Sequence, residues 1–106
     1  MPKITFDIKY STAIDHLQPR QILVIEHEEK EWILCRVDDD IYIMHSRCPH
    51  AGAALTEGAC NARGVVVCPL HGYKFDITKG HSADGHQYKF KSYKLKKSID
   101  FYYFEQ

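Results

Sequence analysis

Two short segments of the chain each carry a thiol and an imidazole. They read Cys48-Pro49-His50-Ala51-Gly52 and Cys68-Pro69-Leu70-His71-Gly72, so Cys, Pro, His and Gly occur twice in the same order. Seventeen residues separate His50 from Cys68. Two thiolates on one iron and two imidazoles on the other are the ligands of one type of [2Fe–2S] centre. Cys48, His50, Cys68 and His71 are therefore the candidate metal and cofactor ligands.

A structural zinc site is the alternative for these four residues, because zinc also takes two Cys and two His. Zinc fingers usually place two Cys first and two His later in the chain. Here each segment mixes one of each, and the two segments repeat the same order. The arrangement favours an iron–sulfur centre, and a zinc-stabilised binding module remains the alternative.

Other residues of types that can bind metals or react as nucleophiles lie outside these two segments. His81, Asp84 and His86 have the composition of a two-histidine, one-carboxylate iron site, but a polar surface loop is the simpler interpretation. Cys35 lies on the apolar face of an expected strand, which predicts a buried core residue. Cys60 lies between the two ligand segments, and we expect a free thiol near the surface.

Composition limits the possible functions. The chain has 106 residues, 44% of them hydrophobic, which predicts one globular domain over residues 1–106. Fourteen basic and fourteen acidic residues cancel, so neither nucleic acid nor an anionic membrane is an expected partner. No run of apolar residues is long enough for a membrane span, and the first residues have no apolar signal core. Cysteines in metal-ligand spacing fit a reducing compartment, so we expect a cytoplasmic protein.

Alternating apolar and polar residues predict strands and no helix. Turns recur about every ten residues, the rhythm of an antiparallel β-sandwich or barrel. The regular pattern is interrupted between residues 46 and 80, where the two ligand loops are inserted. The expected strands are Ile4–Lys9, Gln21–His27, Trp32–Val37, Ile41–His45, Val65–Val67, Tyr73–Ile77, Tyr88–Phe90, Tyr93–Lys96 and Ile99–Phe104.

The words CPHAG and CPLHGYKFD, with the spacing Cys-x-His, seventeen residues, Cys-x-x-His, resemble the signature of the small soluble Rieske ferredoxins. The resemblance runs from about Leu17 to the C-terminus. It implies a Rieske-like all-β fold with a cluster-binding subdomain of two ligand loops, and one [2Fe–2S] cluster per chain. Cys48 and Cys68 would hold the inner iron, and His50 and His71 the outer one.

The same resemblance implies an electron carrier and not an enzyme. A flavin-dependent reductase would be the donor, and an oxygenase or other redox enzyme the acceptor. A second hypothesis is the small cluster-bearing subunit of a nitrite-reductase-like enzyme, whose Rieske-like domain is similar. Arg47, Arg63, Lys74 and Lys79 flank the ligand loops, as ordinary solvated residues or as a basic rim that steers an acidic partner.

High-potential members of the family join the two loops by a disulfide and place a serine and a tyrosine hydroxyl near the cluster. The positions that match the disulfide are Ala53 and Leu70, which cannot form one. The positions that match the hydroxyls are Tyr73 and Phe75; Phe75 has no hydroxyl, and Tyr73 differs too much from serine to make the same bond. Fewer donors to sulfur lower the reduction potential, so we expect a value near the low end of the Rieske range. The third loop beside the cluster usually contains proline in this family, and residues 80–87 contain none.

Overall fold

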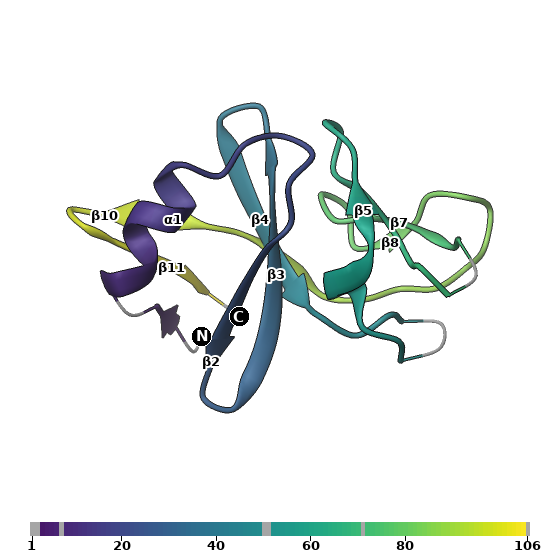
Figure 1. Cartoon of the computed structure of the whole chain (residues 1–106), viewed down its shortest axis with the longest axis horizontal. Coiled ribbons are helices and arrows are strands. Elements are labelled where there is room, and N and C mark those ends of the chain that lie inside the picture. Colours follow the sequence, from purple (N-terminus) through teal and green to yellow (C-terminus); the bar gives the residue numbers. More distant parts are fainter. Residues whose placement is uncertain (1–2, 7, 50–51, 71, 106) are drawn as a thin grey trace.

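A computed structural model describes residues 3–6, 8–49, 52–70 and 72–105 and consists mainly of strands (Figure 1). His50 and His71, two of the four predicted ligands, lie outside the described residues. The elements in chain order are β1 (Lys3–Thr5), the 3₁₀ helix η1 (Ile8–Tyr10), α1 (Ser11–Asp15), β2 (Leu23–His27), β3 (Lys30–Val37), β4 (Asp40–His45), the 3₁₀ helix η2 (Leu55–Glu57), β5 (Ala59–Cys60), β6 (Val65–Val67), β7 (Lys74–Asp76), β8 (His81–Ser82), β9 (Ser92–Lys94), β10 (Lys96–Ser98) and β11 (Phe101–Glu105).

The strands form three antiparallel sheets. The central sheet has the order β2-β3-β4-β9, a second sheet has the order β1-β11-β10, and the third has the order β5-β6-β7-β8. In Figure 1 the long strands β3 and β4 stand between the second sheet with α1 on one side and the third sheet on the other. The prediction of an all-β antiparallel fold is confirmed. Cys48 lies beyond the end of β4 in the central sheet, and Cys68 directly follows β6 in the third sheet.

Strand β3 is buried on both of its faces. Trp32 and Leu34 pack into the core shared with β1, β11 and α1, whereas Ile33 and Cys35 pack into the core shared with the third sheet. Successive side chains of a strand point to opposite faces, so one strand supplies both cores. The second core contains Ile33, Cys35, Met44, Cys48, Leu55, Cys60, Val66, Cys68, Phe75 and Ile77.

The expectation that the chain has no helix is wrong near the N-terminus. The predicted strand Ile4–Lys9 is shorter, and η1 and the five-residue helix α1 follow it. Ile14 and Leu17 are three residues apart and are both buried in the first core, which accounts for the helical turn. Arg36 donates from Nε to the Leu17 carbonyl and so ties this segment to β3. A single apolar pair gives too little periodicity to predict the helix.

The hairpin between β2 and β3 has a polar tip. Glu28 and Glu29 form the two-residue connection with φ values of 52° and 66°. Positive φ at both central residues is the conformation of the tight turns whose twist matches that of the flanking strands.

Further parts of the strand pattern differ from the prediction, and the expected strand Tyr93–Lys96 is divided between β9 and β10. Tyr88–Phe90 is not a strand and contributes one bridge, between Lys89 and His81. The short strands β5 and β8 were not expected, since two residues are too few for an alternating pattern.

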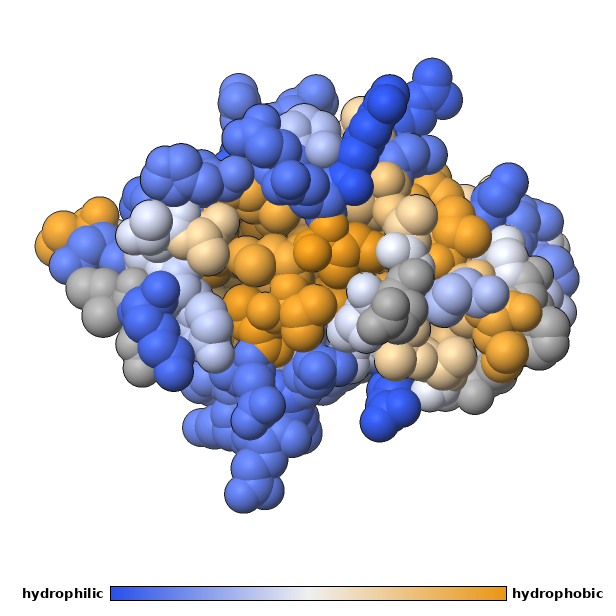
Figure 2. Space-filling model, in the orientation of Figure 1, coloured by the Kyte–Doolittle hydropathy of each residue, from blue (hydrophilic) through white to orange (hydrophobic). Residues whose placement is uncertain are grey.

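The surface in Figure 2 has an apolar area at its centre, over the edge strand β2 and the segments beside it, bordered by hydrophilic residues. Val24, on β2, is 40% exposed. Among the helices of the described residues, none has the length and apolar character needed to cross a bilayer.

Candidate metal centre

The first cysteine lies just beyond β4, in a loop closed by backbone hydrogen bonds. The Cys48 N–H donates to the Ala53 carbonyl at 2.8 Å, and the Gly52 N–H donates back to the Cys48 carbonyl at 2.8 Å. Arg47 donates from its guanidinium to the Gly52 carbonyl at 3.3 Å, and Arg47 and Ala54 form a bridge across the base of the loop. Cys48 itself is 3% exposed.

The second cysteine follows β6 in a loop with the same bonding pattern. The Cys68 N–H donates to the Tyr73 carbonyl at 2.8 Å, and the Gly72 N–H donates to the Cys68 carbonyl at 2.9 Å. Gly52 and Gly72 occupy equivalent positions and share a φ of 71°, the left-handed conformation that glycine adopts without strain. The sequence repeat thus corresponds to a repeat of backbone geometry around two buried thiols.

Comparison with known proteins identifies this pattern. The family model of the Rieske [2Fe-2S] domain, which describes the sequences of that family, matches residues 8–94, which is most of the chain. The chain belongs to this family. The ferredoxin component of the naphthalene 1,2-dioxygenase system of Pseudomonas putida is 30% identical to it over 70 residues, which cover 66% of each chain. This chain therefore spans about two thirds of the length of that curated relative.

Solved structures of Rieske ferredoxins have the same fold as this Rieske domain. The Sphingomonas yanoikuyae B1 ferredoxin gives a TM-score of 0.74 at 23% identity, over 88% of this chain and 92% of that chain. The ferredoxin of carbazole 1,9a-dioxygenase from Nocardioides aromaticivorans IC177 gives a TM-score of 0.71 at 25% identity, over 85% and 88%. The likeness thus covers most of the chain.

The described residues of the Rieske domain fit the [2Fe-2S] cluster of the family. Cys48 and Cys68 are buried in one core, and neither is in a disulfide. Each therefore keeps a thiol that can be deprotonated to a thiolate ligand. No group of three metal-binding side chains forms among residues 3–6, 8–49, 52–70 and 72–105, but the two predicted histidine ligands are not among these residues.

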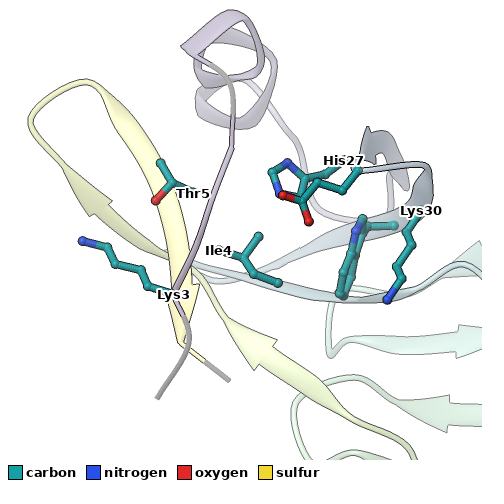
Figure 3. A pocket seen from close by; sticks show the side chains of 7 residues that line it. Lys3, Ile4, Thr5, His27 and Lys30 are labelled. Carbon is teal, nitrogen blue, oxygen red and sulfur yellow. The ribbon is translucent and has the colours of Figure 1, made fainter.

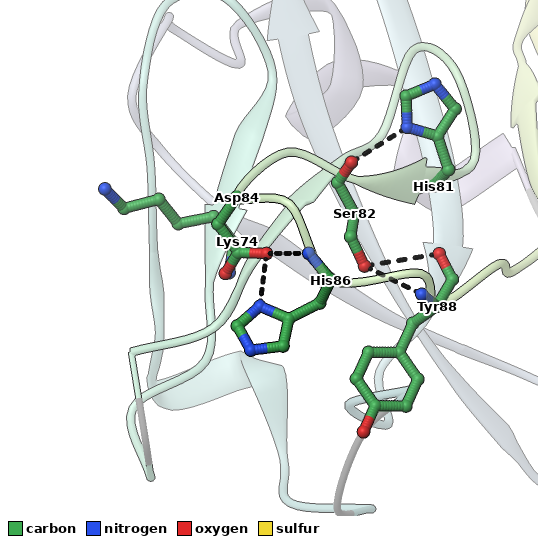
Figure 4. A network of polar contacts seen from close by, with 6 residues as sticks. All are labelled: Lys74, His81, Ser82, Asp84, His86 and Tyr88. Carbon is green, nitrogen blue, oxygen red and sulfur yellow. Dashed lines mark hydrogen bonds and ion pairs between the residues drawn. The ribbon is translucent and has the colours of Figure 1, made fainter.

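The third loop of the sequence analysis, residues 80–87, contains the short strand β8, and its remaining part, residues 83–87, is anchored to β7 beside the second ligand loop (Figure 4). The Asp84 carboxylate accepts the backbone N–H of Lys74 at 2.8 Å and the Nδ1–H of His86 at 2.8 Å. It also accepts the backbone N–H of His86 at 3.3 Å. These bonds, the one from Lys74 foremost, lower the pKa of Asp84 to about 2. The carboxylate is therefore ionised under all physiological conditions.

Aromatic stacking completes this anchor. The His86 ring stacks on the Tyr73 ring with centroids 4.1 Å apart, and Tyr73 lies at the end of the second ligand loop. Ser82 holds the far end of the loop by donating to the Tyr88 carbonyl and accepting the Tyr88 N–H at 3.0 Å. The loop without proline is thus held by polar and aromatic contacts. This role was not predicted from the sequence, although Asp84-Gly85-His86 is a typical Asx-turn sequence.

His81, Asp84 and His86 do not converge on one point. The Nδ1 of His81 lies 2.9 Å from the Ser82 carbonyl, and Figure 4 shows its ring on the other side of the loop from the Asp84–His86 pair. The expected polar surface loop is confirmed, because all three residues are exposed.

The two remaining cysteines lie together in the second core. Cys35 is fully buried, as predicted. The prediction that Cys60 lies near the surface is wrong, since only 8% of it is exposed. Cys60 is the last residue of β5, and its thiol donates to the Gln21 carbonyl at 3.4 Å, so the loop between the ligand segments folds inward there.

A cavity of about 410 Å³ opens at a different place, between β1 and the β2–β3 hairpin (Figure 3). Trp32 lines it, and its indole Nε1 has no hydrogen-bond partner among the described residues. Lys3 extends away from the cavity and places its ammonium 4.2 Å from the centre of the Tyr103 ring. None of the residues lining this cavity is a predicted ligand.

The four basic residues expected to flank the ligand loops are all exposed. Arg47 is engaged with the first loop, as described above, and the backbone of Lys74 holds the third loop. Two members of this predicted basic rim therefore have a structural role beside the loops. Steering of an acidic partner remains a prediction for Arg47, Arg63, Lys74 and Lys79.

Proposed function

We propose that Cys48, His50, Cys68 and His71 hold one [2Fe–2S] cluster and that the chain carries single electrons. The supporting observation is the repeated loop, in which each cysteine N–H donates to the carbonyl five residues later and the glycine N–H donates back to the cysteine carbonyl. Two equivalent loops that bury one thiol each suit a centre with two metal ions. His50 and His71 occur within the same two loops in the sequence.

The bound cluster would supply a centre that accepts and donates one electron. Two thiolates and two neutral imidazoles leave the oxidised form uncharged, so an added electron is less unfavourable than on a four-cysteine cluster. The chain's own residues would set the surroundings of this centre. Burial of Cys48 and Cys68 keeps water from the thiolates, and the two glycines allow the backbone to turn tightly beside them.

The names of the similar proteins suggest the partners. The Pseudomonas putida relative is the ferredoxin component of a dioxygenase system, and the Nocardioides protein is the ferredoxin of a dioxygenase. We infer that an oxygenase-type enzyme is the acceptor and a flavin-dependent reductase the donor. The contact would be weak and transient, as electron-transfer encounters generally are. In this proposal residues 1–106 form a single Rieske domain that functions in the cytoplasm, because cysteines in metal-ligand spacing fit a reducing compartment.

Electron paramagnetic resonance of anaerobically purified, dithionite-reduced protein is the test. A rhombic signal with an average g-value below that of four-cysteine clusters is the expected result. A colourless, zinc-containing and silent sample would contradict the proposal and favour the zinc-stabilised module. Stable co-purification with a large sirohaem enzyme would instead assign the chain as a nitrite-reductase subunit.

Ligand variants assign the residues. Cys48→Ser, Cys68→Ser, His50→Gln and His71→Gln should each lose the signal and the visible absorbance. His81→Gln and Cys60→Ala are the matched controls, since neither residue belongs to the proposed ligand set, and both should retain the signal. Retention of the signal in any ligand variant would remove that residue from the site.

A further inference from the structure

The segment that follows the third loop runs back along β8 and exposes one of its sides. The Ser82 N–H donates to the Tyr88 carbonyl at 2.9 Å, and an antiparallel bridge sets His81 directly opposite Lys89. Ser82 is buried and Tyr88 packs against the second core, whereas His81, Lys89 and Lys91 are exposed. Residues opposite each other in such a pair share a face, and so do alternate residues of one strand. His81, Lys89 and Lys91 therefore form one exposed side, the third-loop basic face.

The lysines of the third-loop basic face differ from those that follow them in the chain. Each of the three lysines on β9 and β10 lies 2.9–3.5 Å from a carboxylate oxygen: Lys94 with Asp40, Lys96 with Glu105 and Lys97 with Asp15. Among the residues that the structure describes, Lys89 and Lys91 form no ion pair of this kind.

The carboxylates closest in the fold to this face are engaged elsewhere. Asp76 accepts the backbone N–H and the hydroxyl of Thr78 at 2.9 and 2.6 Å. Asp84 accepts the N–H groups of Lys74 and His86, as described above. Positive charge is thus left uncompensated beside the third loop, although the chain as a whole has a net charge of zero.

A cavity of about 410 Å³ opens at the third-loop basic face. The residues that line it are His81, Ser82, His86, Gln87, Tyr88 and Lys89. This lining contains an ammonium, two imidazoles and an amide, and no carboxylate. Nδ1 of His86 is bonded to Asp84, and Nδ1 of His81 lies 2.9 Å from the Ser82 carbonyl, which leaves Nε2 of each ring for a ligand. Groups that donate hydrogen bonds and carry positive charge suit a carboxylate.

The cavity also lies beside the second ligand loop. The His86 ring, which lines the cavity, stacks on Tyr73 with centroids 4.1 Å apart. The Tyr73 carbonyl accepts the N–H of Cys68. A side chain held in the cavity would therefore be separated from the second ligand loop by a single aromatic contact.

We propose that the third-loop basic face and its cavity are the docking site for a carboxylate-rich segment of the protein that exchanges electrons with this chain. This docking site rests on the proposed function and adds the chemistry of the partner to it. The cavity receives an acidic side chain, and Lys89 and Lys91 attract the acidic residues beside it. A protein segment is favoured over nucleic acid, because a chain of zero net charge with a short basic face gains little from a long polyanion.

Zero-length cross-linking to an acidic probe tests the site. Purified, coloured protein is mixed at low ionic strength with a hexaglutamate peptide and a water-soluble carbodiimide, which joins a carboxylate to an adjacent lysine amine. Peptide mapping by mass spectrometry should find the probe on Lys89 and Lys91. Absence of cross-links, or an even spread over the other exposed lysines, would overturn the proposal.

Paired variants test the charge of the face. Removing both charges in Lys89→Gln/Lys91→Gln should weaken binding of fluorescein-labelled hexaglutamate, measured by anisotropy, roughly two- to thirty-fold, because exposed ion pairs are individually weak. Lys94→Gln/Lys96→Gln removes the same charge from lysines that already have carboxylate partners and should bind the probe as the unsubstituted protein does. Equal weakening in both double variants would overturn the site, and tighter binding of an oligothymidylate than of the peptide would assign the face to nucleic acid instead. Cross-linking of the unsubstituted protein keeps the proposal testable if a variant folds poorly.

The peptide measurements are independent of the paramagnetic resonance signal. A Rieske signal without cross-links on the third-loop basic face would remove the docking site and leave the proposed function standing. Cross-links on that face without a Rieske signal would remove electron transfer, and with it the assignment of the acidic partner as a redox protein.

Discussion

The Asp84 carboxylate lies 2.8 Å from the backbone nitrogen of Lys74 and accepts its N–H. The residue before Lys74 is Tyr73, whose carbonyl accepts the N–H of Cys68. One carboxylate of the third loop is thereby connected, through two adjacent residues, to the cysteine of the second ligand loop. The arrangement makes Asp84 a positioning residue for the proposed metal centre.

Replacing Asp84 tests this anchor. Asp84→Ala removes the acceptor for the N–H groups of Lys74 and His86, and the free energy of unfolding should fall by about 1–2 kcal/mol. Urea unfolding monitored by circular dichroism measures the change. Asp39→Ala, in the exposed β3–β4 turn, is the control and should change stability by less than about 0.5 kcal/mol. Equal stability of the two variants would show that the anchor contributes nothing.

The anchor should also respond to acid. The pKa of Asp84 is about 2 in the folded protein, below its ordinary value of 3.8. A lowered pKa stabilises the fold above the unfolded-state pKa, and this contribution is lost as pH falls toward the folded-state pKa. The stability difference between the unsubstituted protein and Asp84→Ala should therefore stay constant above about pH 5 and shrink between about pH 4 and 2. A difference that persists at about pH 2 would contradict the role of the charge.

The repeat of Cys, Pro, His and Gly was sufficient to predict the two loops, because chemistry requires those residue types at that spacing. The long strands β3 and β4 were also predictable, since their residues are apolar and their turns are polar. The antiparallel sheets and the similar fold of a solved ferredoxin confirm the all-β fold class. The assignment of the four ligands stays a prediction, because His50 and His71 lie outside the described residues.

Features that depend on tertiary contacts were missed. Helix α1 is too short to show a period, and it forms where Ile14 packs into the core. Cys60 was expected near the surface because it lies between the two ligand segments, yet the pairing of β5 with β6 turns it inward. The anchoring role of Asp84 depends on a backbone N–H ten residues earlier in the chain. The order of side chains along the sequence does not show which backbone group a carboxylate will bind.

Gly72 offers a test of the ligand-loop backbone. A Cβ built there meets no described atom within 4 Å, so substitution should cost only the strain of a φ of 71°. Left-handed conformation costs roughly 1–2 kcal/mol for most residues and less for Asn. Gly72→Ala should accordingly lose its visible absorbance faster on incubation with a chelator than Gly72→Asn, and both faster than the unsubstituted protein. Identical rates in all three proteins would mean that this φ is not required to retain the metal.

The two cores served by β3 should respond differently to truncation. Ile33→Ala and Leu34→Ala each open a cavity at a fully buried position, and each should cost about 2–5 kcal/mol in thermal or urea unfolding. Only Ile33 packs in the core that contains Cys48 and Cys68. Under conditions where both variants remain folded, Ile33→Ala should therefore lose visible absorbance to a chelator faster than Leu34→Ala. The opposite order would contradict the division of the core.

The reduction potential should lie near the low end of the roughly −150 to +300 mV range of Rieske centres. Ala53 and Leu70 cannot form the disulfide of the high-potential members, and Leu70 is 57% exposed. Phe75 is fully buried, packs edge-on against Phe90 with ring centroids 5.9 Å apart, and has no hydroxyl to donate to sulfur. With fewer donors, negative charge on the sulfurs is less stabilised, and reduction is harder. Protein-film voltammetry at neutral pH measures the value, and a strongly positive potential would require donors to sulfur that these residues do not provide.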